Sequence, residues 1–295
     1  MKTIAVIGSG TMGSGIAQVA AAAGYDTIVN DVDQKFLDRC LGGIEKSLDK
    51  FVSKGKLSAD DKAATMGRLQ GTTDLSAVAG ADLIIEAVTE KIEVKRDLFG
   101  RLDELCKPET MLATNTSSLS VTEMAQCTGR AQQVVGMHFF NPPALMKLVE
   151  VVRTPLTSDA TFAAAWEVAE KMGKTPIETR DTPGFIFNRL IIPYLNEAIW
   201  AVSEGVGKVD DIDRAMKLGG NMPIGPLALL DLIGIDVQLH ACSALHREFG
   251  DPKFRVCPLT TQMVRAGYHG RKTGIGFYDY KNDPPTPVDL SIFKF

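Results

Sequence analysis

The chain has 295 residues, a formal net charge of −4 and 45% hydrophobic residues, which is enough apolar material for about two domains with cores of their own. The mild acidity argues against a protein that works on nucleic acid through a basic surface. The five scattered cysteines contain no C-x-x-C pair, which is typical of reduced thiols and argues against a disulfide framework or a zinc site.

The segment 4–25 carries no charged residue and is long enough to suggest a membrane span or a signal peptide. It also contains five glycines, several hydroxyl side chains and Gln18, which a span would have to bury in hydrocarbon. We therefore reject both interpretations and expect a cytoplasmic protein with no membrane partner.

A strand, a glycine-rich turn, a helix and a second strand follow one another at the start of the chain. A strand at 3–7 leads into G-S-G-T-M-G at 8–13, a helix stops at Gly24, and a strand at 27–30 ends at Asp31. In a dinucleotide fold such glycines permit a tight turn, close approach of a pyrophosphate and close packing of helix on strand. The helix N-terminus offers N–H groups to the phosphates. The cofactor candidates of this segment are Gly8, Gly10, Thr11, Met12, Gly13 and Asp31.

The glycine pattern alone often marks only a tight turn, but the flanking strands and the acid favour a cofactor site. Asp31 would accept hydrogen bonds from the adenine ribose hydroxyls and repel a 2′-phosphate. NAD is therefore favoured over NADP, although nearby groups could compensate for the acid.

A segment at about 34–70 is more than a minimal dinucleotide fold needs, and its apolar residues predict a pair of helices. The seam of the first helix repeats at spacings of four and three: Leu37, Leu41, Ile44, Leu48 and Phe51. The second helix begins after Ser58, which forms a capping box with Asp61, and its inner side carries Ala63, Met66 and Leu69.

Three lysines of the first of these helices, Lys46, Lys50 and Lys54, lie on one face. Like charges one turn apart are mildly destabilising. The stripe is either a solvated face or a site for an anionic ligand such as the phosphates of coenzyme A. The residues alone leave the two open.

Later strands continue the doubly wound pattern of a mostly parallel sheet. We predict strands at 83–88, 111–113 and 134–137, with a charged helix between the first two that ends near Cys106. Polar residues at 114–118 and 138–141 follow the last two strands. Because ligands of such sheets sit at the carboxyl ends of the strands, these residues are candidates for a site.

The sequence has four histidines and no spacing typical of metal ligands, so we predict no metal site. His240 lies in an apolar helical stretch and is interpreted as a core residue, and His269 as a solvated loop residue. His138 differs because it closes a strand at the ligand edge of the sheet, which favours a functional role.

Glu150 lies in a strand predicted at 147–152. If that strand neighbours the one ending at His138, the carboxylate would fix the tautomer of the imidazole and raise its basicity. A base of this kind removes a hydroxyl proton during hydride transfer. The alternative is a surface ion pair. Asn188 sits in an apolar helix that follows Gly184. Its amide either binds a ligand or has a structural role, as a helix cap or a hydrogen-bonded core residue.

From about residue 184 the pattern is all helix, so we predict a dinucleotide-binding domain at 1–183 and a helical domain at 184–295. Ile186, Leu190, Ile191, Leu195 and Ile199 form one apolar face, and a very apolar helix is predicted at 227–235. This excess of apolar surface favours a homodimer, and a monomeric bundle is the alternative.

Five motifs in order resemble the 3-hydroxyacyl-CoA dehydrogenases, and the compact length is similar to the bacterial 3-hydroxybutyryl-CoA dehydrogenases. They are G-S-G-T-M-G at 8–13, N-T-S-S-L at 115–119, H-F-F-N-P at 138–142, K-L-V-E-V at 147–151 and D-T-P-G-F-I-F-N-R at 181–189. The resemblance continues through R-K-T-G-I-G-F-Y at 271–278 and covers nearly the whole chain.

The resemblance implies a Rossmann-type α/β domain and a helical dimerisation domain, with roles that carry over residue by residue. His138 would be the general base, polarised by Glu150, and Ser117 and Asn188 would hold the 3-oxygen and the acyl head. The positions that line the cofactor site are Glu90, Lys95, Asn115, Ser117, Asn141 and Lys272. Ser47 and Lys54 match family positions that contact coenzyme A. The resemblance therefore favours the interpretation of the lysine stripe, Lys50 included, as a ligand site.

The implied reaction is NAD(H)-dependent interconversion of (S)-3-hydroxyacyl-CoA, in particular 3-hydroxybutyryl-CoA, and 3-oxoacyl-CoA. One alternative is a 3-hydroxy-acid dehydrogenase that acts on a free acid and does not depend on Lys50 or Lys54. A second is a non-catalytic NAD(H) sensor, which would have no need of a paired base.

Overall fold

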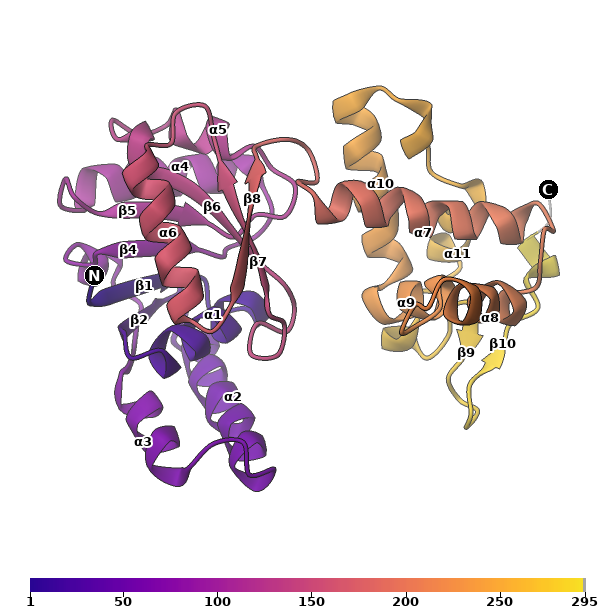
Figure 1. Cartoon of the computed structure of the whole chain (residues 1–295), viewed down its shortest axis with the longest axis horizontal. Coiled ribbons are helices and arrows are strands. Elements are labelled where there is room, and N and C mark those ends of the chain that lie inside the picture. Colours follow the sequence, from indigo (N-terminus) through magenta and orange to yellow (C-terminus); the bar gives the residue numbers. More distant parts are fainter. Residues whose placement is uncertain (294–295) are drawn as a thin grey trace. The chain divides into compact units, whose positions relative to one another are not determined.

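The computed structural model describes residues 1–293, and the chain forms two compact units that divide between Phe185 and Ile186 (Figure 1). The first unit is built on one eight-stranded sheet in the order β3-β2-β1-β4-β5-β6-β7-β8. Its strands are β1 (Thr3–Ile7), β2 (Asp26–Asn30), β3 (Leu69–Thr72), β4 (Leu83–Glu86), β5 (Met111–Thr114), β6 (Val134–Phe139), β7 (Leu148–Arg153) and β8 (Thr175–Arg180).

The order from β3 to β6 is that of a dinucleotide-binding sheet, which reverses direction between β1 and β4. These six strands are parallel, β7 pairs antiparallel with β6, and β8 pairs parallel with β7. The predicted doubly wound, mostly parallel sheet is thus confirmed. The strand β8 is an addition, because the sequence analysis assigned no strand at 175–180.

Helices cover both faces of the sheet (Figure 1). They are α1 (Thr11–Ala22), α2 (Gln34–Ser53), α3 (Ala59–Gly67), α4 (Ile92–Leu105), α5 (Val121–Ala125) and α6 (Asp159–Lys171). Alternate residues of β1 point to opposite faces: Ile4 and Val6 pack with α1, α2 and α6, whereas Ala5 and Ile7 pack with α4 and α5. The sheet is therefore buried on both sides and presents only its edges to ligands.

The predicted helical pair is α2 and α3, and the structure corrects its second member. The Ser58 hydroxyl accepts a hydrogen bond from the backbone N–H of Asp61 at 3.0 Å and donates to its carboxylate at 2.6 Å. The inner side was predicted correctly in part: Met66 packs against the core, and so does Leu69, which opens β3. Ala63 is exposed, and Thr65 is the buried residue of the helix. A helix of nine residues is too short for its periodicity to fix the buried face from sequence.

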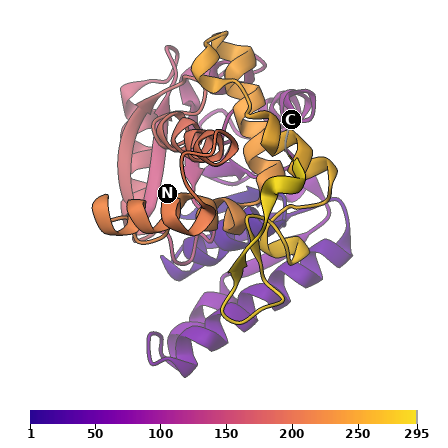
Figure 2. The same ribbon diagram turned by 90° about the vertical axis from the view of Figure 1, so that its right-hand side faces the viewer.

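The second unit is helical, with a small hairpin near its end (Figure 2). Its elements are α7 (Phe187–Ser203), α8 (Val209–Gly219), α9 (Pro226–Ile233), α10 (Ile235–Phe249), α11 (Pro258–Arg265), β9 (Tyr278–Asp279) and β10 (Thr286–Pro287). Leu195, Ile199, Leu227 and Leu230 contribute to its core. The hairpin was not foreseen in the all-helical prediction.

The prediction of an apolar helix at 227–235 is wrong at its C-terminal end, because the helix stops before Gly234. Gly234 has a φ of +112°, a conformation that favours glycine, and α9 and α10 meet there at a bend of 96°. No single helix among the described residues is long and apolar enough to cross a membrane, and α9 with α10 would qualify only as this bent pair, by length and composition.

Two buried carboxylates hold the second unit together. Asp213 accepts hydrogen bonds from the N–H groups of Leu227 at 2.7 Å and Ala228 at 3.0 Å, so it caps α9 from α8. Asp231 accepts from the N–H groups of Phe277 and Tyr278, both at 2.9 Å. Burial raises the pKa of Asp231 to about 6. The acid of α9 thus fixes the C-terminal segment to the helices.

Candidate cofactor and catalytic site

The three glycines of the turn after β1 have different structural reasons. Gly8 has a φ of +98°, and a Cβ there would lie 2.6 Å from the carbonyl oxygen of Ala87. A Cβ on Gly13 would overlap the carbonyl oxygen of Gly8, whereas a Cβ on Gly10 would meet nothing within 4 Å. Gly10 therefore borders open space at the N-terminus of α1, where no side chain caps the helix. This space and the N–H groups around it fit the pyrophosphate of a dinucleotide.

Asp31 lies directly against this turn from the end of β2. One carboxylate oxygen accepts hydrogen bonds from the Ser9 backbone N–H at 2.7 Å and the Ser9 hydroxyl at 2.6 Å. The other accepts from the N–H of Val32 at 2.7 Å. The sequence placed the acid beside the turn but did not indicate Ser9. The pair holds a negative charge where an adenine ribose would sit, which fits NAD better than NADP.

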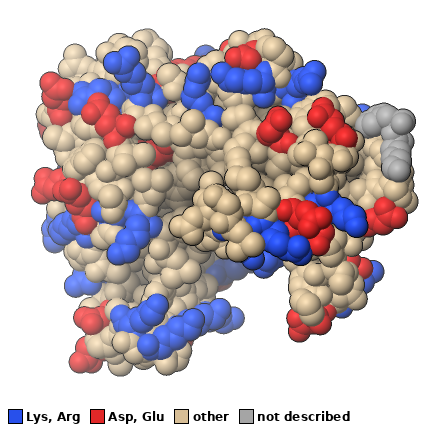
Figure 3. Space-filling model, turned by 45° about the vertical axis from the view of Figure 1, so that its right-hand side comes forward, with Lys and Arg blue, Asp and Glu red and all other residues tan. Residues whose placement is uncertain are grey.

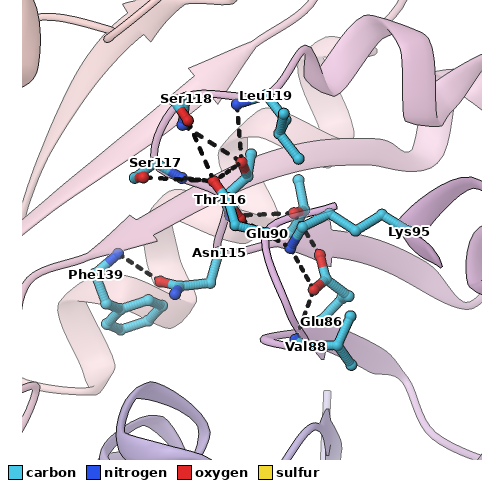
Figure 4. Close-up of polar contacts among 11 residues, drawn as sticks. Glu86, Val88, Glu90, Lys95, Asn115, Thr116, Ser117, Ser118, Leu119 and Phe139 are labelled. Atoms are coloured by element: carbon cyan, nitrogen blue, oxygen red, sulfur yellow. Dashed lines mark hydrogen bonds and ion pairs between the residues drawn. The ribbon is translucent and has the colours of Figure 1, made fainter. Parts of the chain in front are cut away.

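A polar network joins the ends of β4 and β5 (Figure 4). Glu90 accepts hydrogen bonds from the Thr116 hydroxyl at 2.6 Å and the Ser117 N–H at 2.9 Å, and lies 3.3 Å from the Lys95 ammonium group. Burial opposes the charge of Glu90, but Lys95 and these hydrogen bonds outweigh it and lower the pKa of the carboxyl group. Lys95 is only 1% exposed and pairs at 2.5 Å with Glu86.

Asn115 lies at the same carboxyl edge of the sheet. Its side-chain oxygen accepts a hydrogen bond from the Phe139 N–H at 2.9 Å (Figure 4). This bond links the end of β5 to the end of β6. The structure thus brings together Glu90, Lys95, Asn115 and Ser117 of the predicted cofactor set. Glu86, which ends β4 and contacts Lys95, was not singled out from the sequence.

His138 and Glu150 face each other across the antiparallel pair β6 and β7. They are direct partners in the strand register, and His138 Nδ1 lies 2.7 Å from a carboxylate oxygen of Glu150. Glu150 is fully buried and His138 is 6% exposed. The rings of Phe140 and Phe185 lie 4.6 and 5.7 Å from the imidazole, between centroids. The pair is therefore buried beside two aromatic rings, and a hydrogen bond to a charged group is strong in such surroundings.

The loop between β6 and β7 is fixed to the dinucleotide fold at two points. A Cβ on Gly15 of α1 would come within 2.5 Å of Pro143, so this glycine lets the loop lie on the helix. The Lys174 ammonium group donates to the carbonyl oxygens of Pro143 and Met146. Asn141, a predicted cofactor residue, is exposed in this loop.

Two predicted site residues belong to the second unit. Asn188 is half-buried in the first turn of α7. Lys272 donates to Asp236 at 2.6 Å. Lys272 was expected beside the cofactor, and the acid that it contacts was not foreseen.

The lysines of the stripe on α2 are solvent-exposed, and within residues 1–293 none of them forms an ion pair. Glu45 and Asp49 of the same helix pair instead with Lys62 of α3, at 3.4 and 2.6 Å. Figure 3 shows Lys and Arg side chains gathered over the α2–α3 end of the first unit. Lys50 and Lys54 are exposed and Ser47 is half-buried.

The structure corrects two interpretations of histidines. His240 is exposed on α10 and is not a core residue, and His269 is half-buried with Nε2 3.1 Å from the carbonyl oxygen of Val264. Within residues 1–293, no group of three or more His, Cys, Asp or Glu residues could hold a metal ion.

Comparisons with known proteins cover nearly the whole chain. The sequence model described as "3-hydroxyacyl-CoA dehydrogenase, NAD binding domain" matches residues 3–182, and the C-terminal domain of the same family matches residues 184–280. The 3-hydroxybutyryl-CoA dehydrogenase of Clostridioides difficile is 50% identical over 277 residues, which are 94% of this chain and 99% of that protein. The mitochondrial hydroxyacyl-coenzyme A dehydrogenase of Sus scrofa is 43% identical over 95% of this chain and 92% of that protein. The crystal structure of (S)-3-hydroxybutyryl-CoA dehydrogenase from Ralstonia eutropha matches with a TM-score of 0.93 and 41% identity, over 96% of this chain and 100% of that chain.

Proposed function

Because the chain belongs to the 3-hydroxyacyl-CoA dehydrogenase family, we propose that it interconverts (S)-3-hydroxyacyl-CoA and 3-oxoacyl-CoA with NAD(H). The observation that carries the proposal is the buried His138–Glu150 pair at the carboxyl edge of a dinucleotide-binding sheet. The name of the relative that is 50% identical favours 3-hydroxybutyryl-CoA and acetoacetyl-CoA as the substrate pair.

The residues of the first unit fit the cofactor. Gly10 leaves room for the pyrophosphate, the first turn of α1 supplies N–H donors, and Asp31 receives the adenine ribose. When bound, NAD(H) supplies the hydride acceptor or donor for C3 of the substrate. The remaining predicted cofactor residues of the first unit are proposed to line the rest of the cofactor site: Glu90, Lys95, Asn115, Ser117 and Asn141.

His138 is the general acid–base of this proposal. The Glu150 carboxylate accepts the Nδ1–H of His138, which leaves Nε2 as the proton acceptor. In oxidation Nε2 takes the proton of the 3-hydroxyl group, and Glu150 stabilises the imidazolium ion that forms. In reduction the same Nε2 returns the proton to the 3-oxygen.

Ser117 and Asn188 are proposed to orient the substrate. A hydroxyl and an amide that donate to the 3-oxygen would stabilise the negative charge that develops there. The N–H of Ser117 is held by Glu90 at 2.9 Å, which fixes the loop that presents the hydroxyl. Asn188 lies in the first turn of α7, a position from which its side chain does not interrupt the helix.

The exposed face of α2 is proposed as the site for coenzyme A phosphates. Glu45 and Asp49 form their ion pairs with Lys62 of α3, so neither acid is paired with Lys50 or Lys54, whose positive charges can attract an anion. Ser47 on the same face supplies a hydroxyl.

We further propose a homodimer formed through the second unit, and a cytoplasmic location. Apolar side chains exposed around the α9–α10 bend support the dimer.

An assay of NADH consumption with acetoacetyl-CoA tests the function, run beside free acetoacetate. We expect rapid turnover of the thioester alone. His138→Gln and Glu150→Gln should each reduce kcat by about 100-fold or more, since general acid–base catalysis contributes ~100- to 10,000-fold. His240→Gln, which alters an exposed histidine of α10, is the matched control and should turn over at the wild-type rate.

Equal turnover of free acetoacetate would refute the coenzyme A assignment and favour a free-acid dehydrogenase. Binding of NADH without turnover of either compound would favour a sensor. A His138→Gln variant with wild-type kcat would remove the histidine from the mechanism.

The coenzyme A site has its own test in the Michaelis constants. Lys50→Met and Lys54→Met should raise the KM for acetoacetyl-CoA roughly tenfold, about 1.4 kcal/mol, with little change in kcat, because they remove binding far from the reacting atoms. The effect should shrink at high salt. Lys217→Met, which removes an exposed lysine of α8, is the control, and its KM should stay at the wild-type value. A KM that is unchanged in both stripe variants would show that the lysines are a solvated face.

A further inference from the structure

Glu86 is a fully buried acid at the ligand edge of the sheet, and neither the sequence motifs nor the proposed mechanism uses it. It ends β4 and is 0% exposed. One carboxylate oxygen accepts hydrogen bonds from the Val88 N–H at 2.7 Å and from Lys95 at 2.5 Å, and the other accepts from the Thr114 hydroxyl at 2.6 Å. A carboxylate buried within an apolar strand costs free energy unless such partners surround it.

The partners of Glu86 come from three elements that border the proposed site (Figure 4). Val88 belongs to the segment after β4 whose backbone lies against Gly8 of the glycine turn. Thr114 ends β5, and its hydroxyl also accepts from the Thr116 N–H at 3.1 Å. Lys95 lies in the first turn of α4. A single carboxylate therefore ties the glycine turn, the loop after β5 and α4 to one point.

The position of Lys95 explains why a second acid is needed beside Glu90. A cation in the first turn of a helix is disfavoured by the helix dipole, and Lys95 is also buried. Glu86 forms the shorter of its two ion pairs, at 2.5 Å against 3.3 Å for Glu90. Lys95 pairs with Oε2 of Glu90, and Oε1 of the same carboxylate accepts from the Thr116 hydroxyl and the Ser117 N–H.

We propose that Glu86 is a positioning residue, which acts through Lys95 and Glu90 to hold the loop of residues 115–119 in the geometry that hydride transfer requires. The chain runs from Glu86 to Lys95, from Lys95 to Glu90, and from Glu90 to the Ser117 N–H (Figure 4). The expected effect of Glu86 on kcat rests on the proposed function. Its effect on the geometry of the loop does not, because the loop is held by contacts within the protein.

The test compares Glu86→Gln with Asp82→Asn. Asp82 lies at the opposite end of the same strand and also pairs with a lysine, Lys107 at 2.8 Å, and with backbone N–H groups. Both variants remove one carboxylate that holds a lysine, so both are expected to lower Tm. Only Glu86→Gln should lower kcat for acetoacetyl-CoA, by about 10- to 100-fold, as expected for a small displacement of reacting groups. The KM for the thioester should change little.

Two further readouts separate positioning from a loss of stability. Amide hydrogen exchange of the ligand-free protein should speed up at residues 115–119 in Glu86→Gln and not in Asp82→Asn. If Glu86 acts through Lys95, the double variant Glu86→Gln/Lys95→Gln should have the kcat of Lys95→Gln alone. Where Glu86→Gln does not fold, Glu86→Asp keeps the charge but draws the carboxylate back from Lys95 and Thr114, and it should speed exchange in the same loop.

Wild-type kcat and loop exchange in Glu86→Gln, with Tm lowered as in Asp82→Asn, would reduce Glu86 to a structural acid and overturn the proposal. Additive losses in the double variant would overturn the path through Lys95. Failure of the wild-type chain to reduce acetoacetyl-CoA would refute the proposed function instead. The exchange comparison would then still decide whether Glu86 holds the loop.

Discussion

Gly8, Gly10 and Gly13 show how one residue type serves three purposes within six positions. Gly8 supplies a left-handed backbone, Gly13 allows contact between the turn and the helix, and only Gly10 faces open space. Gly8 and Gly13 are therefore required by the fold, and Gly10 by a ligand that fills the space beside it.

Gly10→Ala should separate binding from folding. Gly10 has a φ of −64°, which alanine adopts without strain, so the free energy of unfolding should change by less than about 1 kcal/mol. The Kd for NADH should rise about tenfold or more, because the added methyl group occupies the space proposed for the pyrophosphate. Fluorescence titration and chemical denaturation measure the two effects.

Gly13→Ala is the matched control, since its methyl group would overlap the Gly8 carbonyl oxygen. It should lose about 1–3 kcal/mol of stability through overpacking. An unchanged Kd for NADH in Gly10→Ala would show that the dinucleotide does not pass this glycine.

Single residues were predictable from sequence where their surroundings are local. The glycine turn and Asp31 lie within one strand–turn–helix–strand unit, so their proximity followed from the pattern. Glu86 was missed because its partners come from other elements, although an acid in a buried strand always needs partners. His240 was misplaced because α10 buries Gln238 and Cys242 on either side of it, and a helix turns the residue between them outward.

At the scale of elements, the sequence predicted β6 and β7 but not their direction. An antiparallel pair places Glu150 directly opposite His138, and the register follows only once the strands are paired. The strand β8 was missed because it contains Pro176 and several polar residues, as edge strands often do. The apolar residues on both sides of Gly234, from Leu227 to Ile235, concealed the break between α9 and α10.

The attachment of the C-terminal segment to α9 should depend on pH through Asp231. The folded-state pKa of Asp231 is raised from 3.8 to about 6, so the protonated form is favoured by folding. Its contribution to stability is fully present below pH 3.8 and is lost as the pH rises to 6, by about 3 kcal/mol in all. The free energy of unfolding, relative to Asp231→Asn, should therefore fall over this interval.

Trp200 of α7 reports on the second unit once Trp166 is replaced by Phe, since these are the only two tryptophans in the sequence. Urea denaturation at a series of pH values in this background measures the slope. Asp279→Asn, in β9, retains Asp231 and should keep the same slope. Parallel curves for the Trp166→Phe background and its Asp231→Asn derivative would show that Asp231 does not titrate in this range.

At the scale of the molecule, the family, the fold class and the NAD-dependent dehydrogenase function predicted from the motifs are confirmed by the comparisons. Motifs spread in order along the chain carry this information because each one fixes the end of a different strand or helix. No motif indicates the number of chains in the oligomer or the location of the protein in the cell, and both stay predictions.

The proposed dimer predicts a mass in solution of about twice the 31.8 kDa of one chain. Leu232, Ile233 and Val237 are 56, 41 and 46% exposed around the bend between α9 and α10, which is a costly surface for a monomer. Val237→Glu should produce a monomer in light scattering coupled to gel filtration. Val206→Lys, an isolated exposed site after α7, should leave the dimer intact, and a monomeric wild-type chain would refute the assembly.

The reversal of direction at β7 has a consequence for dividing the protein into fragments. The connection between His138 and Glu150 is a short surface loop, and Leu145 within it is 63% exposed. A cut after Leu145 leaves the base on the fragment 1–145 and its carboxylate on the fragment 146–295. Neither fragment then holds the acid–base pair, and catalysis becomes a signal that the two pieces have come together.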